Sequence, residues 1–149
     1  MMKDIFFSSA SNNEKLDMLL KGSQRILLKA SSVFPFDFFP DELTIDENKV
    51  NIIFHPFFFS KDVHSIMIEM IRDIEVETGP FLAVLKLVPD GYPGHALELR
   101  YLKRNDALKA RRIIEGLMVA RRHCIDPSKL DSPDFLKQIE TLGKTSLTE

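Results

Sequence analysis

The sequence lacks the cysteine pairs that form disulfide bonds and the long apolar segments that span membranes. It has one cysteine and no tryptophan in 149 residues. A single cysteine excludes a disulfide framework and a four-thiolate metal site. No apolar run reaches the roughly 18 residues that a membrane-spanning helix needs, and residues 1–8 are too short and too polar for a secretory signal. These absences favour a cytoplasmic, reducing location.

What the chain does have is a composition typical of one folded domain, with 44% hydrophobic residues, 28% charged residues and a net charge of -2. Although the net charge is small, acidic and basic residues are unevenly distributed along the chain. Residues 31–100 hold twelve acidic and five basic residues, whereas residues 101–124 hold seven basic and two acidic residues. Charge asymmetry of this kind affects partners and internal docking rather than the fold.

Phenylalanine is concentrated in one part of the chain. Eight of the twelve phenylalanines lie between Phe34 and Phe59, and seven of these fall in two runs over residues 34–40 and 57–59. Large aromatic side chains usually fill a core, so we expect this cluster to plug the interior of the domain. Any part of the cluster that is exposed would instead form a surface for a partner.

Hydrophobic periodicity predicts a helix followed by a series of strands. Residues 11–29 have helical spacing and begin with a capping box, Ser11 and Glu14. From residue 41 the period changes to two, which is typical of strands. The predicted strands are residues 43–46 and 50–54, which form a hairpin that breaks at Pro56, and residues 64–69, 74–77, 81–88 and 97–101. Strands this short and evenly spaced are typical of a barrel or sandwich.

Two helices are predicted after the strands. Asn105 or Asp106 is the expected N-cap of a helix that ends at Arg122 and has one apolar stripe. Pro133 suits the first turn of a further short helix near residues 133–142, and Gly143 is expected to end that helix.

The order of six strands and one amphipathic helix resembles that of pleckstrin-homology-like domains, in particular the bacterial group. The patterns that carry the resemblance are Leu43-Thr44-Ile45-Asp46, residues 81–88, Leu97-Glu98-Leu99-Arg100-Tyr101 and the helix start Asn105-Asp106-Ala107. The resemblance covers residues 41–122. It implies a strongly bent antiparallel barrel capped by a C-terminal helix, and a binding scaffold that often self-associates.

One known property of the wider superfamily does not carry over to this sequence. Members that bind phosphoinositides place several lysines and arginines around the first hairpin. Here the predicted hairpin turn is Asp46-Glu47-Asn48-Lys49, and Lys49 and Lys61 are the nearby cations. Because carboxylates repel phosphate, we do not expect this chain to bind lipid headgroups at that hairpin.

We therefore predict an α+β fold, namely a pleckstrin-homology-like bent antiparallel β-barrel of six or seven strands. A C-terminal helix caps the barrel, and an additional amphipathic helix precedes it. The expected organisation is a helical and Phe/Pro-rich lead-in over residues 1–40, the pleckstrin-homology-like domain over residues 41–124 and a tail with a short helix over residues 125–149.

No motif points to catalysis or to a cofactor. Cys124 has cationic neighbours but no well-placed base. The histidines lack the spacing of a metal-ligand set. They are His55, His64, His95 and His123. We predict no enzyme activity, no catalytic residue, no metal and no cofactor.

These features favour a non-catalytic protein-interaction scaffold that self-associates, with exposed strand edges and amphipathic helices as contact elements. A strand turns alternate side chains to opposite faces, so part of the run at residues 57–59 is expected to face a partner. The residues expected to bind a partner are Phe57, Phe58, Phe59, Arg111, Arg112, Arg121 and Arg122.

The alternative is a peripheral membrane adaptor that binds anionic lipid through the basic helix. Nucleic acid is not expected as a partner, because the domain is acidic overall.

Overall fold

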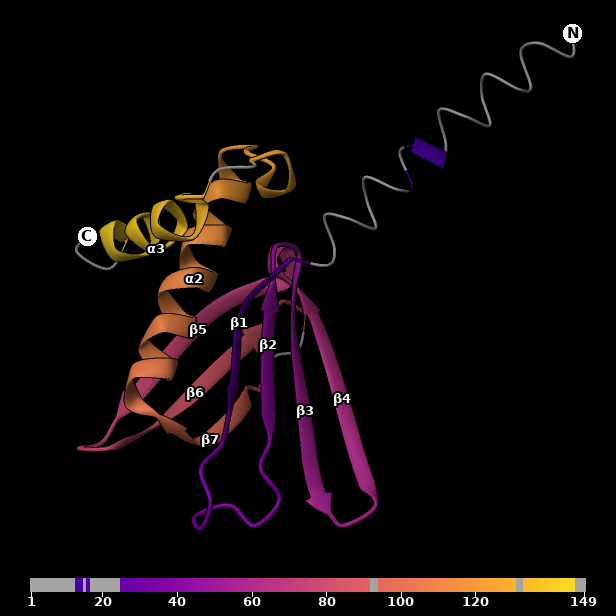
Figure 1. The fold of residues 1–149 in the computed structure, drawn as a ribbon, viewed down its shortest axis with the longest axis vertical. Helices are drawn as coiled ribbons and strands as arrows, with labels where there is room; N and C mark the ends of the chain where they lie inside the picture. The colour runs from indigo at the N-terminus through magenta and orange to yellow at the C-terminus, as the bar shows by residue number, and fades with distance from the viewer. Residues whose placement is uncertain (1–12, 15, 17–24, 92–93, 131–132, 147–149) are drawn as a thin grey trace, which may run out of the picture.

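The structure is a computed structural model, and it describes all residues except 1–12, 15, 17–24, 92–93, 131–132 and 147–149. Its described part is built on two antiparallel sheets (Figure 1). The first sheet has the order β1-β2-β3-β4 and the second has the order β5-β6-β7. The strands are β1 (Ile26–Ser31), β2 (Glu42–Asp46), β3 (Lys49–Phe57), β4 (Ser60–Met67), β5 (Ile71–Thr78), β6 (Leu82–Pro89) and β7 (Leu97–Lys103).

Helices follow the second sheet. Helix α2 (Arg104–Arg122) packs against β5, β6 and β7, and helix α3 (Phe135–Ser146) crosses over α2 on the side away from the sheets (Figure 1). Short 3-10 turns, η1 (Ile68–Met70) and η2 (Pro127–Lys129), lie between β4 and β5 and between the two helices. One isolated bridge, Ser32 to Leu102, joins the end of β1 to β7.

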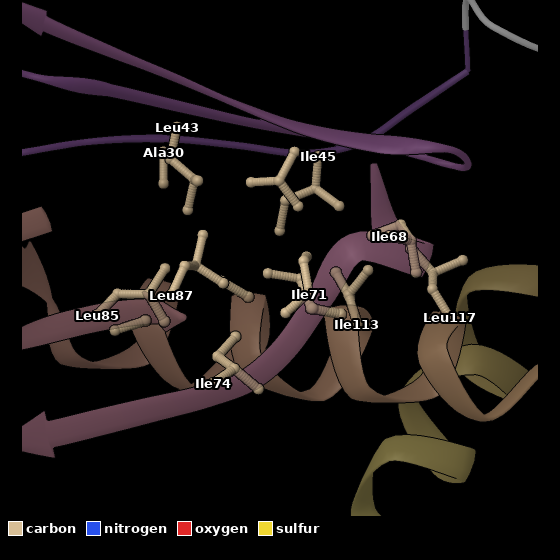
Figure 2. Packing of buried hydrophobic residues seen from close by; sticks show 14 of the residues in the cluster. Ala30, Leu43, Ile45, Ile68, Ile71, Ile74, Leu85, Leu87, Ile113 and Leu117 are labelled. Carbon is tan, nitrogen blue, oxygen red and sulfur yellow. The ribbon is translucent and has the colours of Figure 1, made fainter. Parts of the chain in front are cut away.

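Alternation along the strands explains the core. In the predicted hairpin, Leu43 lies opposite Ile52 and Ile45 lies opposite Val50, and all four side chains are fully buried. Alternate residues point to one face of a strand, so the same period brings Leu85 and Leu87 of β6 to face them. In β5 the register shifts after Ile71, so its buried residues, Ile71 and Ile74, are three positions apart. Figure 2 shows this aliphatic layer between the first sheet and the apolar stripe of α2. The predicted hairpin and the stripe of α2 are confirmed.

The expectation of a phenylalanine-filled interior is wrong. Phe135 is buried, but it lies in α3, and among the clustered phenylalanines only Phe54 packs against the core. The physical reason is position along the chain. Most of the cluster falls in the β1–β2 loop and at the β3–β4 turn, beyond the ends of the paired strands, and leucine and isoleucine already fill the space between the sheets.

The predicted helix over residues 11–29 is wrong at its C-terminal end. Residues 26–29 belong to β1, where Leu28 lies opposite Ile45 and Ala30 lies opposite Leu43. Pairing with β2 outweighs the helical spacing of this segment, as tertiary contacts commonly do. Of the rest, Asn13, Glu14 and Leu16 are helical, Arg25 is described but is not helical, and the other residues lie outside the described part of the chain. The first sheet thus begins before residue 41.

Two helix boundaries also differ from the prediction. Helix α2 begins at Arg104, before either expected N-cap, directly after β7. Gly143 does not end α3, which continues to Ser146. A Cβ on Gly143 would lie 1.9 Å from the carbonyl oxygen of Arg112, and one on Gly116 would lie 2.0 Å from that of Ile139. Each glycine therefore permits a close approach of α2 and α3.

Candidate interaction surface

Two connections bring the clustered phenylalanines together at one end of the first sheet. The loop between β1 and β2 spans residues 32–41, and the β3–β4 turn consists of Phe58 and Phe59. Both lie at the end opposite the β2–β3 turn (Figure 1). The rings of Phe39 and Phe58 meet edge to face, with centroids 4.5 Å apart. This contact joins the two connections into one surface.

Six of these rings are largely exposed, with relative exposures between 61% and 103%. We call them the phenylalanine surface: Phe34, Phe36, Phe38, Phe57, Phe58 and Phe59. At 150–250 Å² per ring, they expose on the order of 900 Å² of aromatic area. The largest apolar patch on an ordinary monomer is roughly 300–600 Å², and a standard interface buries about 800 Å² per partner. The exposed area is therefore typical of an interface.

A hydrogen-bond network holds the β1–β2 loop in place. The Ser32 hydroxyl donates to Asp37 Oδ2 at 2.7 Å and accepts from the Asp41 amide at 2.7 Å. The Phe39 amide donates to Asp37 Oδ1 at 3.1 Å, and the His55 amide donates to Asp41 Oδ1 at 2.8 Å. Burial raises the pKa of Asp41 more than the His55 hydrogen bond lowers it. These bonds fix the exposed rings on an ordered framework, which lowers the entropy cost of binding.

Ring contacts extend the surface toward β7. Phe34 and Phe38 meet edge to face at 5.9 Å, and Phe36 stacks on Tyr101 at 6.2 Å. Tyr101 has a φ of 59°, and the register of β6 and β7 shifts beside it. The shift turns Tyr101 outward, next to the loop whose Val33 amide donates to its carbonyl oxygen at 2.9 Å.

The charges near the phenylalanine surface are mainly negative. Without the β2–β3 turn at the other end of the sheet, residues 32–42 and 53–62 contain four acidic residues and one basic residue, and Lys29 and Lys103 line a cavity beside Phe34. The loop of the first hairpin, which is β1–β2 rather than the predicted β2–β3, contains no lysine or arginine in residues 32–41. The loop of the true first hairpin therefore lacks the cations that a phosphate group would need, although Lys29 of β1 and Lys103 line the cavity beside Phe34.

The structure does not bring the predicted arginines to the phenylalanine surface. Arg111 is half-buried and pairs with Glu115 at 3.1 Å, and Arg112 lies 3.9 Å from Glu140 of α3. Arg121 donates to Asn48 Oδ1 and lies 3.4 Å from Glu69. Asn48 is in the β2–β3 turn, so Arg121 stands at the other end of β3 from Phe57.

Arg122 is the exposed member of the four predicted arginines. It lines a small cavity of about 180 Å³ with Arg72, Asp73 and Glu115. Three of the four arginines thus have carboxylate partners within this chain, which reduces the positive charge that α2 presents to a membrane.

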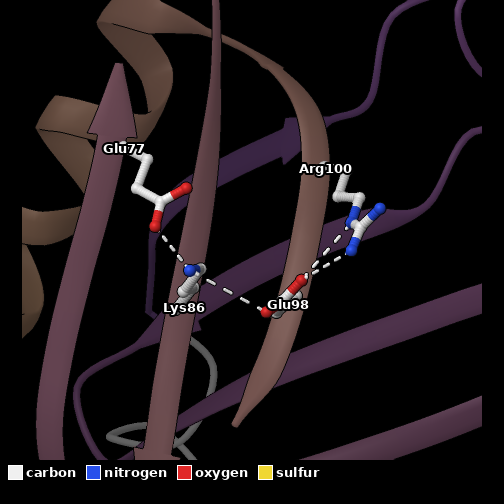
Figure 3. A network of polar contacts seen from close by, with 4 residues as sticks. All are labelled: Glu77, Lys86, Glu98 and Arg100. Atoms are coloured by element: carbon white, nitrogen blue, oxygen red, sulfur yellow. Dashed lines mark hydrogen bonds and ion pairs between the residues drawn. The ribbon is translucent and has the colours of Figure 1, made fainter.

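The acidic side chains of β5 form part of a solvated charge ladder. Lys86 Nζ of β6 lies 2.5 Å from Glu77 and 3.9 Å from Glu98 of β7, which in turn pairs with Arg100 at 2.9 Å (Figure 3). The hydrogen bond with Glu77 raises the pKa of Lys86. Glu77 and Glu98 therefore both have cationic partners on the surface of the sheet, as expected for a solvated face.

A feature that the sequence analysis missed is the open edge of β4. A groove of about 660 Å³ runs along it, between β4 residues such as Val63 and Ile66 and a far wall formed by Met70, Pro89 and Leu97. His64 and His95 both line this groove, yet among the described residues no group of three or more potential ligands could hold a metal ion. The polar residues at the start of β4 could have indicated this exposed edge. The alternation at residues 64–69 instead predicted a strand that begins after them.

Comparison with known proteins supports the fold. The chain is similar to a pleckstrin homology domain from Shewanella amazonensis SB2B, known from a crystal structure, with a TM-score of 0.50 and 21% sequence identity. The match covers 73% of this chain and 96% of that one. No family model matches the sequence, and no curated protein matches it either.

Two antiparallel sheets and a C-terminal helix, together with this similarity, define a pleckstrin-homology-like fold. The predicted resemblance is confirmed at the level of the fold. Within the described residues, no helix has the length and apolar character that crossing a bilayer requires.

Proposed function

We propose that this chain is a non-catalytic protein-interaction module that self-associates and contacts its partners through the phenylalanine surface. The observation that carries the proposal is the exposure of six phenylalanine rings on hydrogen-bonded connections at one end of the first sheet. Keeping such an area in water is unfavourable, at roughly 25 cal/mol per Å². Binding of an apolar partner surface removes that penalty.

Charge favours a protein partner over an anionic membrane. The segments that carry the exposed rings, residues 32–42 and 53–62, have four acidic residues and one basic residue. Anionic lipid attracts lysine and arginine and repels carboxylates, each charge near the surface being worth about 1 kcal/mol. A protein partner, in contrast, can place cations opposite the carboxylates while covering the rings.

The test is sedimentation equilibrium of the full chain and of the triple variant F57S/F58S/F59S. We expect the wild-type chain to form dimers or larger oligomers, and the triple variant to associate at least about tenfold more weakly. The matched control is I26S, because Ile26 is 59% exposed but pairs with Asp46 beside the β2–β3 turn, at the end of the first sheet opposite the phenylalanine surface. A wild-type chain that stays monomeric at millimolar concentration would overturn self-association.

The membrane alternative is tested separately by sedimentation with vesicles. Binding to anionic but not to zwitterionic vesicles, lost at high salt, would support the adaptor that binds through the basic helix. We expect no binding to either kind of vesicle. The variant R122E, which changes the exposed arginine, shows whether any binding observed uses α2.

A further inference from the structure

The edge strand β4 presents an unusually open edge. It pairs with β3, and no other described strand pairs with it. In Figure 1 it is the outermost strand of the first sheet. Seven of its eight residues are exposed. Unpaired backbone N–H and C=O groups on such an edge are a template for a further strand, and natural proteins usually protect them.

The side chains along this edge are also unusual. The rings and chains on the outer face include Phe59, Val63 and Met67, with relative exposures of 103%, 61% and 51%. Lysine or proline in the middle of the strand would discourage pairing, but the central residues here are Val63 and His64. The edge therefore combines free hydrogen-bonding groups with exposed apolar side chains.

We propose that β4 is the dimerisation strand, and that a second copy of this chain pairs with it in antiparallel orientation about a two-fold axis at Val63. This proposal rests on the proposed self-association and gives it a geometry. The two copies would then share one continuous eight-stranded sheet made from their first sheets. Strand addition of this kind supplies main-chain hydrogen bonds, and opposed side chains fix the register.

Symmetry limits the possible registers. A two-fold axis that relates adjacent antiparallel strands stands perpendicular to the sheet, so opposed residues share a face and the axis passes through a residue position. An axis at Asp62 would oppose Asp62 to its own copy, and an axis at Lys61 would do the same to Lys61. Like charges directly opposite one another are destabilising. Both registers are therefore unfavourable.

The axis at Val63 opposes no like charges along β4, although Ser60 then lies opposite Ile66. Val63 packs on its own copy, and Asp62 lies opposite His64 of the second copy on the groove side. Lys61 then faces Ser65. On the outer face Phe59 lies opposite Met67, a contact that suits a ring and a thioether.

An axis at His64 loses these pairs, because it opposes His64 to its own copy and Lys61 to Met67. Charge and apolar complementarity therefore select a second copy of this chain as the occupant of the edge. The register leaves Phe34, Phe36 and Phe38 outside the strand pair, where they remain available for other contacts.

Cysteine crosslinking of the full chain tests both the partner and the register. Residues directly opposite one another have Cα atoms about 4.5–5.5 Å apart, within the range of a disulfide. In a Cys124→Ser background, V63C is expected to form a covalent dimer under mild oxidation. The matched controls K61C and S65C are equally exposed, but each lies roughly 14 Å from its own copy in this register and should not crosslink with itself.

A mixture of K61C and S65C provides the positive control, because these two positions oppose each other across the axis. Crosslinking of V63C and of this mixture, but not of K61C or S65C alone, is the expected result. Crosslinking of K61C alone or S65C alone, or no crosslinking of V63C, would overturn the register.

A charge exchange gives a second measurement that needs no oxidation. H64E places a carboxylate opposite Asp62 of the second copy and should weaken dimerisation at least about tenfold, whereas the double variant D62K/H64E replaces this repulsion with an attractive pair and should recover most of it. Failure of this rescue while the wild-type chain still self-associates would overturn the strand pairing and leave the proposed function intact. A monomeric wild-type chain would overturn both.

Discussion

The close approach of α2 and α3 leads to a prediction for the stability of Gly116→Ala. A rise in stability would reflect the higher helix propensity of alanine, and a fall would reflect a clash between the two helices. In an open helix, replacing glycine by alanine stabilises by about 1 kcal/mol. At Gly116 the added Cβ would lie 2.0 Å from the Ile139 carbonyl oxygen and 2.8 Å from its carbon, against 3.4–4 Å for an ordinary contact. The helices would have to separate by more than an ångström, because the obstacle is backbone.

The magnitude follows from these two opposed terms. Overpacking a close-packed site costs roughly 1–3 kcal/mol, and a backbone obstacle places this site at the upper end. Separation of the helices would also loosen Phe135 and Ile139, which are 3% and 2% exposed. After subtraction of the gain in helix propensity, we expect Gly116→Ala to lower the free energy of unfolding by about 2 kcal/mol.

Urea unfolding followed by circular dichroism measures this change, and hydrogen exchange in α3 shows whether the helix detaches before the sheets unfold. Lys144→Ala is the control, because Lys144 is exposed in α3, and a change within about 0.5 kcal/mol is expected there. A Gly116→Ala variant that equals or exceeds the wild-type stability would refute the reasoning, since it would show that the helices are not in close contact at this point.

Two further predictions concern charged groups. Burial raises the pKa of Glu47 above 4.5, and the Arg25 guanidinium at 2.7 Å only partly opposes this effect. A raised folded-state pKa favours folding while the carboxyl is protonated, so the stability of the wild type relative to Glu47→Gln should fall as the pH rises above about 4.5 in urea titrations; an increase would contradict this. In the charge ladder, Lys86→Met should shift the thermal midpoint only at low salt, and a shift that persists at high salt would show that the ladder contributes more than screened surface pairs.

In the proposed self-association, the β4 edge and the phenylalanine surface belong to one interface. The β4 edge supplies directional hydrogen bonds, and the phenylalanine surface supplies apolar area, which together are the two parts of a specific interface. The arginines of α2 have a different role in the described structure. Through Glu140 and Glu69 they tie α2 to α3 and to the turn before β5.

The sequence by itself determined the elements whose pattern is local. Alternation at Leu43, Ile45, Val50 and Ile52 predicted the β2–β3 hairpin, and the stripe from Ala107 to Leu117 predicted the face of α2 that packs against the sheets. These predictions succeed because the period of buried residues follows directly from the geometry of a strand or a helix. The resemblance to pleckstrin-homology-like domains rested on the same local patterns.

Only the tertiary structure decided which segments are covered. Residues 26–31 have helical spacing but pair with β2, because a partner strand satisfies their backbone and buries Ala30. The clustered phenylalanines have the character of core residues, but most of them lie in the β1–β2 loop and at the β3–β4 turn, outside the space between the sheets, and remain exposed. Gly143 matches a helix terminus but marks a helix contact. In each case the outcome depends on what lies across from the residue in space, which the order of residues along the chain does not encode locally.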